Sequence, residues 1–150
     1  MALTGEYVPS PFAQTREQVE LYESSGGTRG TTLRGRPVVI LTTVGASSGK
    51  LRKSALMRVE HEGSYAVIAS MGGAPEHPSW YGNLRAHPLV DLQDGPTTRS
   101  YLAHVATGTE RDEWWARAVE VWPDYDEYAR RTTREIPVVV LTPVADPQST

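Results

Sequence analysis

A cluster of cations follows a glycine- and serine-rich turn in the first third of the sequence. Residues 45–49 read GASSG, and Lys50, Arg52 and Lys53 follow them. Backbone amides, hydroxyl groups and cations in one turn favour an anionic ligand, because an arginine can hold a phosphate or carboxylate with two parallel hydrogen bonds. A plain hairpin turn would explain the glycines alone, whereas the cations favour an anion site. The turn does not match a phosphate-binding P-loop, since only three residues separate its glycines and Leu51 stands where that motif needs a hydroxyl residue.

A second group of residues, further along the chain, could contact a flat ligand. Gly72 and Gly73 allow close approach to the backbone, and Trp80 and Tyr81 offer aromatic surface. Asn83 lies three residues beyond Trp80, so one helical face could present both a ring and an amide. A permissive loop and core packing are the ordinary explanations of these residues. Their proximity to the cationic turn nevertheless predicts a ligand with a charged tail and a planar head.

Three aromatic residues nearer the C-terminus, Trp122, Tyr125 and Tyr128, recur at every third position. On a helix this spacing gathers the rings on roughly one side, for which core packing is the usual explanation. Two of the rings carry hydroxyl groups, and a tyrosine beside a cavity can donate a proton to a developing oxyanion. The sequence has no GxSxG motif and no helical histidine pair, so it gives no support for triad hydrolysis or a metal centre.

The composition describes one soluble globular domain of 150 residues, with 39% hydrophobic and 22% charged residues. A net charge of −3 argues against a nucleic-acid-binding protein. No apolar run approaches the ~20 residues that cross a bilayer, and no signal sequence is evident, so we expect a cytoplasmic protein that is at most peripheral to a membrane. With no cysteine in the chain, redox chemistry would need electrons from a bound cofactor.

Hydrophobic patterns and turn residues predict the order of the elements. We expect an arm at residues 1–13, a glycine- and arginine-rich connector at residues 28–36 and a flexible tail at residues 145–150. Helices are predicted at residues 14–24, 78–86, 109–122 and 125–130, and strands at residues 37–44, 52–61, 64–70, 89–93, 99–106 and 136–142. Glu62 and Gly63 predict a tight hairpin turn, and residues 94–98 a longer hairpin loop. Because hairpins connect the strands, the sequence predicts a mainly β (α+β) fold, an antiparallel barrel of about six strands with peripheral helices.

Three motifs in combination resemble the deazaflavin-dependent nitroreductase family of actinobacteria, which uses coenzyme F420. They are TTxGxxSGxxR at residues 42–52, ASxGG at residues 69–73 and PxWYxNLxAxP at residues 78–88. The resemblance extends over about residues 36–144. It implies a split β-barrel, like that of flavin-binding pyridoxamine-oxidase relatives, in agreement with the hairpin pattern.

The resemblance also implies a role for each motif. The first loop would hold the phosphate and polyglutamate tail, the next strand and residues 68–72 would line the deazaflavin ring and ribityl chain, and residues 79–83 would close the far side of the ring. The implied cofactor-binding residues are Ser47, Ser48, Gly49, Lys50, Arg52, Lys53, Ser54, Ala55, Leu56, Met57, Ile68, Ala69, Ser70, Met71, Gly72, Ser79, Trp80, Tyr81, Gly82 and Asn83. Ser70, Tyr125 and Tyr128 match positions that border the substrate pocket, and they are the expected catalytic residues.

The sequence departs from the family pattern at positions that are often basic. Ala46 and Ser47 stand before Ser48, and Met71 follows Ser70. An arginine of the connector at residues 28–36, or the lysines near the turn, could compensate for the missing charge.

The implied activity is that of an F420H2-dependent reductase, which transfers a hydride to a quinone, an enone or lactone, or a nitroaromatic compound. The cofactor would supply the chemistry, so few catalytic side chains are needed. Two alternatives stay open. One is an FMN-dependent enzyme of the same barrel class, since FMN has a single phosphate and no polyglutamate tail, and the other is a non-catalytic module that binds deazaflavin. The oligomeric state, monomer or homodimer, is also open.

Overall fold

The computed structural model describes residues 3–144, so the predicted tail at residues 145–150 and the first two residues of the arm lie outside the described part of the chain. The helices are α1 (Ala13–Ser24), α2 (Ser79–Ala86), α3 (Gly108–Val121) and α4 (Asp124–Arg131), and a short 3-10 turn, η1, spans Met71–Gly73. The strands are β1 (Thr32–Leu33), β2 (Arg36–Val44), β3 (Leu51–Met57), β4 (Glu60–His61), β5 (Ser64–Ile68), β6 (Leu89–Asp94), β7 (Thr97–Val105) and β8 (Val138–Pro143).

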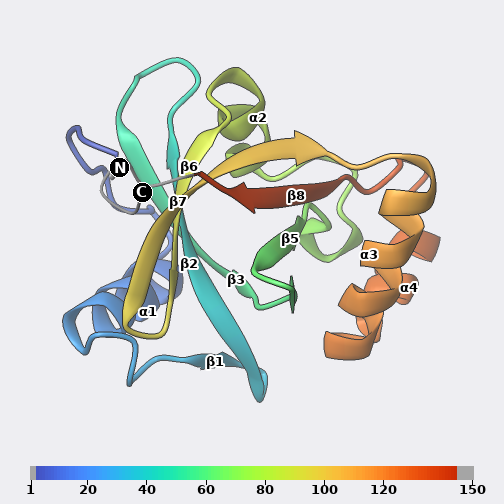
Figure 1. Ribbon diagram of the computed structural model, residues 1–150, viewed down its shortest axis with the longest axis horizontal. Coiled ribbons are helices and arrows are strands. Elements are labelled where there is room, and N and C mark those ends of the chain that lie inside the picture. Colours follow the sequence, from blue (N-terminus) through green and yellow to red (C-terminus); the bar gives the residue numbers. More distant parts are fainter. Residues whose placement is uncertain (1–2, 145–150) are drawn as a thin grey trace.

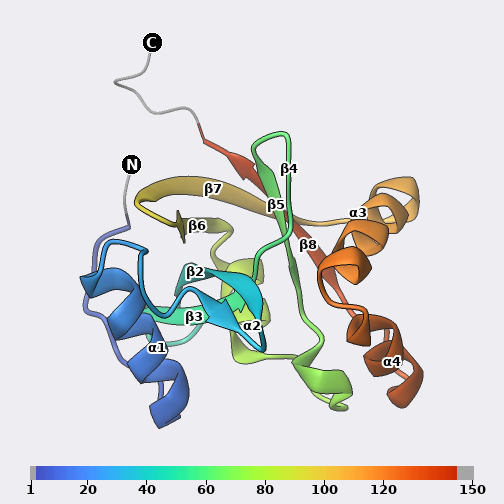
Figure 2. The same ribbon diagram turned by 90° about the horizontal axis from the view of Figure 1, so that it is seen from below.

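The strands form one antiparallel sheet that curls into a half-barrel, with α1 at one end of the molecule and α3 and α4 at the other (Figures 1 and 2). The strand order is β1-β2-β6-β7-β8-β5-β4, and of these described strands β3 pairs only with β2. The mainly β split-barrel prediction is therefore confirmed, although the described residues form eight strands instead of about six. Over residues 3–144, none of the helices combines the length and apolar character needed to cross a bilayer.

The two faces of β2 pack into different clusters, because side chains alternate along a strand. Val39 and Leu41 enter the barrel interior, where α2 also buries its apolar face. Val38 and Ile40 pack against α1 on the opposite face. Each of the four side chains is at most 2% exposed, so burial contributes about 1.5–3 kcal/mol apiece and fixes β2 between the barrel interior and α1. A third cluster joins α3 and α4 to the outer face of β5 and β8.

The strand predicted over residues 52–61 was wrong in extent, because the chain leaves β2 after Met57. β3 pairs with β2, whereas β4 pairs with β5 through only two residue pairs. Val59 is 1% exposed and belongs to the cluster that includes α3. Its carbonyl accepts a hydrogen bond from Ala66 N at 2.9 Å, so this residue is bonded to β5 and not to β2. The strand predicted over residues 64–70 likewise ends at Ile68 and pairs mainly with β8.

Two turns also differ from expectation. β6 and β7 are joined by a two-residue turn instead of a longer loop, with Asp94 opposite Thr97 and a left-handed φ of 61° at Gly95. The connector contains β1, whose hairpin to β2 turns at Arg34 and Gly35 with φ values of 50° and 77°. Two successive left-handed residues are what a two-residue hairpin of type I′ requires.

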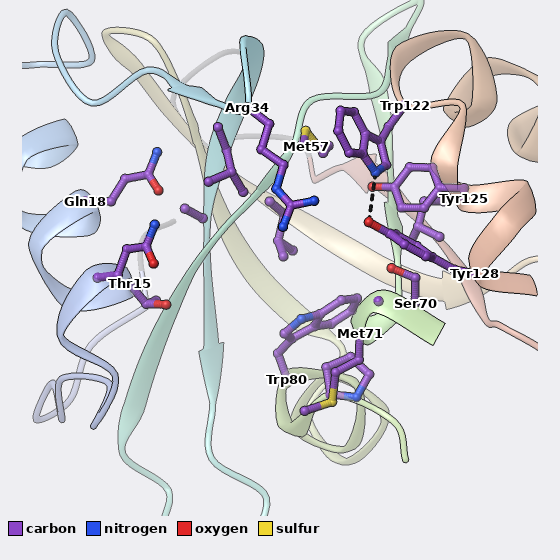
Figure 3. Close-up of a pocket in the computed structure, with 17 residues that line it drawn as sticks. Thr15, Gln18, Arg34, Met57, Ser70, Met71, Trp80, Trp122, Tyr125 and Tyr128 are labelled. Carbon is purple, nitrogen blue, oxygen red and sulfur yellow. Dashed lines mark hydrogen bonds between the residues drawn. The ribbon is translucent and has the colours of Figure 1, made fainter. Parts of the chain in front are cut away.

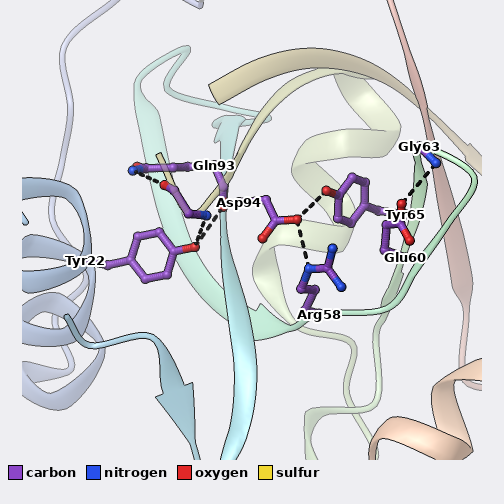
Figure 4. Close-up of polar contacts among 8 residues, drawn as sticks. Tyr22, Arg58, Glu60, Gly63, Tyr65, Gln93 and Asp94 are labelled. Carbon is purple, nitrogen blue, oxygen red and sulfur yellow. Dashed lines mark hydrogen bonds and ion pairs between the residues drawn. The ribbon is translucent and has the colours of Figure 1, made fainter. Parts of the chain in front are cut away.

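A polar network at the β6–β7 turn ties together elements from three parts of the chain (Figure 4). Asp94 Oδ2 accepts from the Tyr65 hydroxyl at 2.5 Å and from Arg58 Nε at 2.8 Å. Burial, followed by the contact with Asp94, raises the pKa of Tyr65, so its hydroxyl remains a donor. Gly95 N donates to the Tyr22 hydroxyl at 2.7 Å, which attaches α1 to the same turn. The network holds this end of the half-barrel together.

Candidate active site

A cavity of about 510 Å³ lies between α1 on one side and α4 on the other, with β3 crossing it (Figure 3). Its volume falls in the range of small-molecule sites, roughly 300–1,000 Å³. The residues that line it are Gln14, Thr15, Gln18, Leu33, Arg34, Ala55, Leu56, Met57, Ile68, Ser70, Met71, Gly72, Pro78, Trp80, Trp122, Tyr125 and Tyr128.

The site residues predicted from the sequence fall into two groups. Those at the cavity are Ala55, Leu56, Met57, Ile68, Ser70, Met71, Gly72, Trp80, Tyr125 and Tyr128. Those that do not line it are Ser47, Ser48, Gly49, Lys50, Arg52, Lys53, Ser54, Ala69, Ser79, Tyr81, Gly82 and Asn83. The first group includes every expected catalytic residue. Most of the second group belongs to α2 or to the glycine- and serine-rich turn and the cations that follow it, called the charged turn below.

Among residues 3–144, no strand pairs with the edge of β3 that faces the cavity. At the start of β3, Leu51 N donates to Glu6 O at 2.8 Å and Leu51 O accepts from Val8 N at 2.9 Å, so the expected arm covers the edge there. Alternate residues of a strand direct their backbone groups to the same side. Ala55 and Met57, which line the cavity, therefore present their N–H and carbonyl groups to it.

The facing edge of β5 likewise has no strand partner in the described part of the chain where it meets the cavity. Ala69 N donates to Pro137 O at 3.0 Å, on the side of β8. The alternating positions Ile68 and Ser70 consequently direct their N–H groups the other way, toward the cavity that both residues line. The split between two strand edges thus offers backbone donors and acceptors to a ligand, and this arrangement was not predicted from the sequence.

The turn after β5 is held by one arginine from the loop between α4 and β8. Arg134 donates from Nη1 to Ala69 O at 3.1 Å, from Nη2 to Ser70 O at 2.8 Å and from Nε to Ala74 O at 2.9 Å. Nη1 also lies 3.0 Å from His77 Nδ1. A planar guanidinium has five N–H donors, so a single side chain can satisfy all of these groups. No motif in the sequence singled out Arg134.

Helix α4 packs directly on this turn at Gly73. A Cβ atom at Gly73 would lie 2.9 Å from Tyr128 O and 3.1 Å from Tyr128 Cα, and the residue has a left-handed φ of 82°. Met71 and Gly72 are left-handed as well, with φ of 46° and 64°. Glycine at position 73 therefore permits the close approach that brings Tyr128 beside Ser70, which explains the second glycine of the ASxGG motif.

An aromatic wall closes the α4 side of the cavity. Trp122 Nε1 donates to the Tyr128 hydroxyl at 3.2 Å, and the rings of Tyr125 and Tyr128 meet edge to face with centroids 6.2 Å apart. Figure 3 shows the tyrosine hydroxyls directed from α4 toward the cavity. α3 ends at Val121, so the three rings are gathered across a helix break and not along one continuous helix.

The Tyr125 hydroxyl remains protonated at neutral pH. The residue is 6% exposed, and burial, with a smaller contribution from Tyr128, raises the pKa of Tyr125 above its usual value of about 10. Within residues 3–144 this hydroxyl forms no hydrogen bond. It is therefore available to donate to a ligand.

The three cations near the glycine- and serine-rich turn, Lys50, Arg52 and Lys53, differ in whether a carboxylate lies beside them. Lys50 Nζ lies 3.2 Å from Glu6 Oε2, and Lys53 is paired with Glu23 of α1. Over the described part of the chain, Arg52 has no acidic partner and no hydrogen bond. Arg52 is thus the cation of the turn that is open to an anionic ligand.

Asn83 positions the charged turn and does not line the cavity. Its Oδ1 accepts from Ala46 N at 3.0 Å and its Nδ2 donates to Thr43 Oγ1 at 3.2 Å. The amide therefore connects α2 to the loop that follows β2. Ala69 and Tyr81, also predicted as site residues, are core residues with 0% and 9% exposure.

Several cavity residues were not predicted as site residues. They are Gln14, Thr15 and Gln18 of α1, with Leu33, Arg34, Pro78 and Trp122. Arg34 stands at the β1–β2 turn, and its guanidinium lies 5.8 Å from the centroid of the Trp122 ring. In the sequence, the Arg34-Gly35 pair between two extended segments could have indicated this turn. The three cavity residues of α1 could not be predicted, because they depend on how the helix packs against the sheet.

The comparisons with known proteins agree with the motifs. Residues 14–143 match the protein family described as F420H(2)-dependent quinone reductase. An F420H(2)-dependent quinone reductase of Mycobacterium tuberculosis is 34% identical over 128 residues, which cover 81% of this chain and 85% of that protein. A second protein of that organism, named as a putative F420H(2)-dependent quinone reductase, is 35% identical over 107 residues, covering 71% of this chain and 90% of its own.

Solved structures give the same result. A structure titled F420-H2 dependent reductase (FDR-A) is 50% identical, with a TM-score of 0.67, and covers 71% of this chain and 94% of its own. Another, titled as a domain-swapped dimer, is 47% identical, with a TM-score of 0.70, and covers 88% of this chain and 99% of its own. A haem storage protein of Vibrio cholerae, 16% identical with a TM-score of 0.57 over 75% of this chain and 85% of its own, shares the fold.

The fold and the cavity thus define a split-barrel protein with a site for a small molecule. By sequence and structure, the chain belongs to the F420H(2)-dependent quinone reductase family. The family resemblance inferred from the three motifs is confirmed.

Proposed function

We propose that this protein is an F420H2-dependent quinone reductase whose cofactor lies along β3. The proposal rests on one observation: β3 connects the cavity to a free cation. The unpaired edge of β3 forms part of the cavity at Ala55 and Met57, and the same strand contains Arg52, which has no acidic partner among residues 3–144. Ala55 lies three positions after Arg52 along the strand, a distance of about 10 Å. This separation suits a planar head joined to a charged group through a short chain.

The residues at the cavity fit the deazaflavin head. The unpaired β3 edge supplies both donors and acceptors for a heterocycle, and Trp80 offers an aromatic surface beside it. Gly72 lines the same space, where a Cβ would meet no atom within 4 Å, so the backbone lies open to a flat ligand there. Arg52 would take the phosphate or the first glutamate of the tail, while Lys50 and Lys53 already have carboxylate partners.

When bound, reduced F420 supplies a hydride. The protein's part is to orient the acceptor and to exclude water, and Trp80 and Trp122 bound the cavity on two sides. The protonated Tyr125 hydroxyl can donate a hydrogen bond to an acceptor oxygen. A quinone presents such an oxygen, and the names of the relatives favour it over enones and nitroaromatic compounds as the acceptor.

Tryptophan fluorescence provides the test, because Trp80 and Trp122 line the cavity. Titration with F420 is expected to quench the emission, and F420H2 is expected to be oxidised by menadione under anaerobic conditions. FMN serves as the competing ligand, since the compensated lysines leave one open cation at the turn for its single phosphate. Tighter binding of FMN than of F420 would favour the FMN enzyme, and F420 binding without turnover across a panel of quinones would favour a cofactor-binding module.

A further inference from the structure

The Ala69–Ser70 and Ser70–Met71 peptide groups, at the end of β5, direct their carbonyl oxygens toward Arg134 and their N–H groups away from it. Ala69 O and Ser70 O both accept hydrogen bonds from Arg134. Every peptide bond in residues 3–144 is trans. In a trans peptide the N–H points opposite to the carbonyl, so Ser70 N–H and Met71 N–H both point away from the Arg134 guanidinium.

These two N–H groups, together with Gly72 N, are the donors of the turn for which residues 3–144 supply no acceptor. Gly73 N and Ala74 N are bonded within it, to Ser70 O at 2.9 Å and Met71 O at 3.1 Å. Ser70 N and Met71 N have no acceptor in residues 3–144. Ser70 is 7% exposed and Met71 is 53% exposed, so of the two donors the Ser70 N–H is the one in a buried residue, although both residues line the cavity. A buried N–H without a partner costs about 1–3 kcal/mol, so a ligand atom that accepts from it is favoured at this position.

The Ser70 and Met71 N–H groups lie near tyrosine hydroxyls that can also donate hydrogen bonds to an oxygen atom of a ligand. Tyr128 is held beside the turn by the close approach of α4 to Gly73, and its neighbour Tyr125 brings a protonated hydroxyl to the same wall. Arg134 does not line the cavity, so its charge stays behind the peptide groups and polarises them from that side. The arrangement is that of an oxyanion hole, with fixed dipoles aimed at a place where negative charge develops.

We propose that the Ser70–Met71 peptide groups, held by Arg134, form the oxyanion-binding element for the acceptor. Hydride transfer delivers two electrons and one hydrogen nucleus to the quinone, oxidises the cofactor, and leaves a negative charge on a quinone oxygen until a proton arrives from solvent. The two N–H groups receive that oxygen. Arg134 is a positioning residue, because it acts through the peptide groups and does not contact the acceptor. This inference rests on the function proposed above.

Replacing Arg134 by glutamine or lysine tests the proposal, with Arg111→Gln as the matched control. Arg111 donates from Nη2 to Ile136 O at 2.8 Å, so it anchors the same loop without reaching the turn at Ser70. Arg134→Gln is expected to lower kcat for menadione about 10- to 100-fold, with KM and the Kd of F420 within about threefold. Arg134→Lys keeps the positive charge on a single nitrogen but loses the planar fork, so its kcat is expected to fall between those of the parent and Arg134→Gln. Arg111→Gln is expected to lower Tm and leave kcat within about twofold.

A binding measurement gives a second readout that needs no turnover. 2-Hydroxy-1,4-naphthoquinone is an anion at neutral pH, whereas menadione is neutral, so an oxyanion element binds the former more tightly. Arg134→Gln is expected to reduce this preference about tenfold, and Arg134→Lys is expected to reduce it less, as measured by tryptophan fluorescence of the F420-loaded protein. An unchanged preference, an unchanged kcat, or an F420 affinity that falls as far as kcat would overturn the proposal. If the parent does not oxidise F420H2 with any quinone, the proposed function fails, and the anion preference still tests the element.

Discussion

Replacing Gly73 by alanine tests how closely α4 packs against the turn that carries Ser70. The added Cβ would lie 2.9 Å from Tyr128 O and 3.3 Å from Arg131 Cβ, and both partners belong to a helix whose backbone is fixed. A left-handed L residue costs about 1–2 kcal/mol, and overpacking of this kind about 1–3 kcal/mol. Gly73→Ala is therefore expected to lower the free energy of unfolding by about 2–5 kcal/mol and to move α4 away from Ser70.

Gly72→Ala separates the two contributions. Gly72 is also left-handed, with φ of 64°, but a Cβ there would meet nothing within 4 Å. This variant is expected to lose only the conformational term, about 1–2 kcal/mol. Urea denaturation of both variants measures the difference, which we expect to be at least about 1 kcal/mol. Equal stabilities within about 0.5 kcal/mol would show that α4 does not press on the turn, and the account of Gly73 would be wrong.

Three further predictions follow from other contacts. Tyr125→Phe is expected to lower kcat/KM for menadione about tenfold, the worth of one positioning hydrogen bond of about 1.4 kcal/mol, with little change in F420 affinity by fluorescence titration. Arg52→Ala is expected to weaken F420 binding by about 1.5–3 kcal/mol and to reduce its salt dependence, whereas Lys50→Ala has a smaller effect because Lys50 is already paired with Glu6. Because burial raises the pKa of Tyr125 above the unfolded value of about 10, its contribution to stability is fully present below pH 10 and is lost as the pH rises beyond it. Tm is thus expected to fall above pH 10, and to fall less steeply in Tyr125→Phe; parallel curves for the two proteins would contradict this.

Much of the architecture could be predicted from local patterns along the chain. The β-branched run of β2, the hairpin signals and the proline-led helix α2 are properties of short segments, because strand and turn preferences act over a few residues. The motifs also pointed to Ser70, Trp80 and Tyr125 as cavity residues, and these three line it. Helix bounds agree with the predictions to within about one residue at most ends, since prolines and glycines mark several of them locally.

Only the tertiary structure decided which groups meet at the cavity. The open split depends on β5 pairing with β8 and not with β3. Because β5 and β8 are far apart in the sequence, their pairing leaves no local signal. The same holds for Arg134, which reaches carbonyl groups 60 to 65 positions away in the sequence. Whether Lys53 stays open to a ligand was settled by α1, which places Glu23 beside it. Residue type determines what a side chain can donate or accept, but its partners are set by long-range packing, because the chain folds to bury its apolar clusters and carries the polar groups with it.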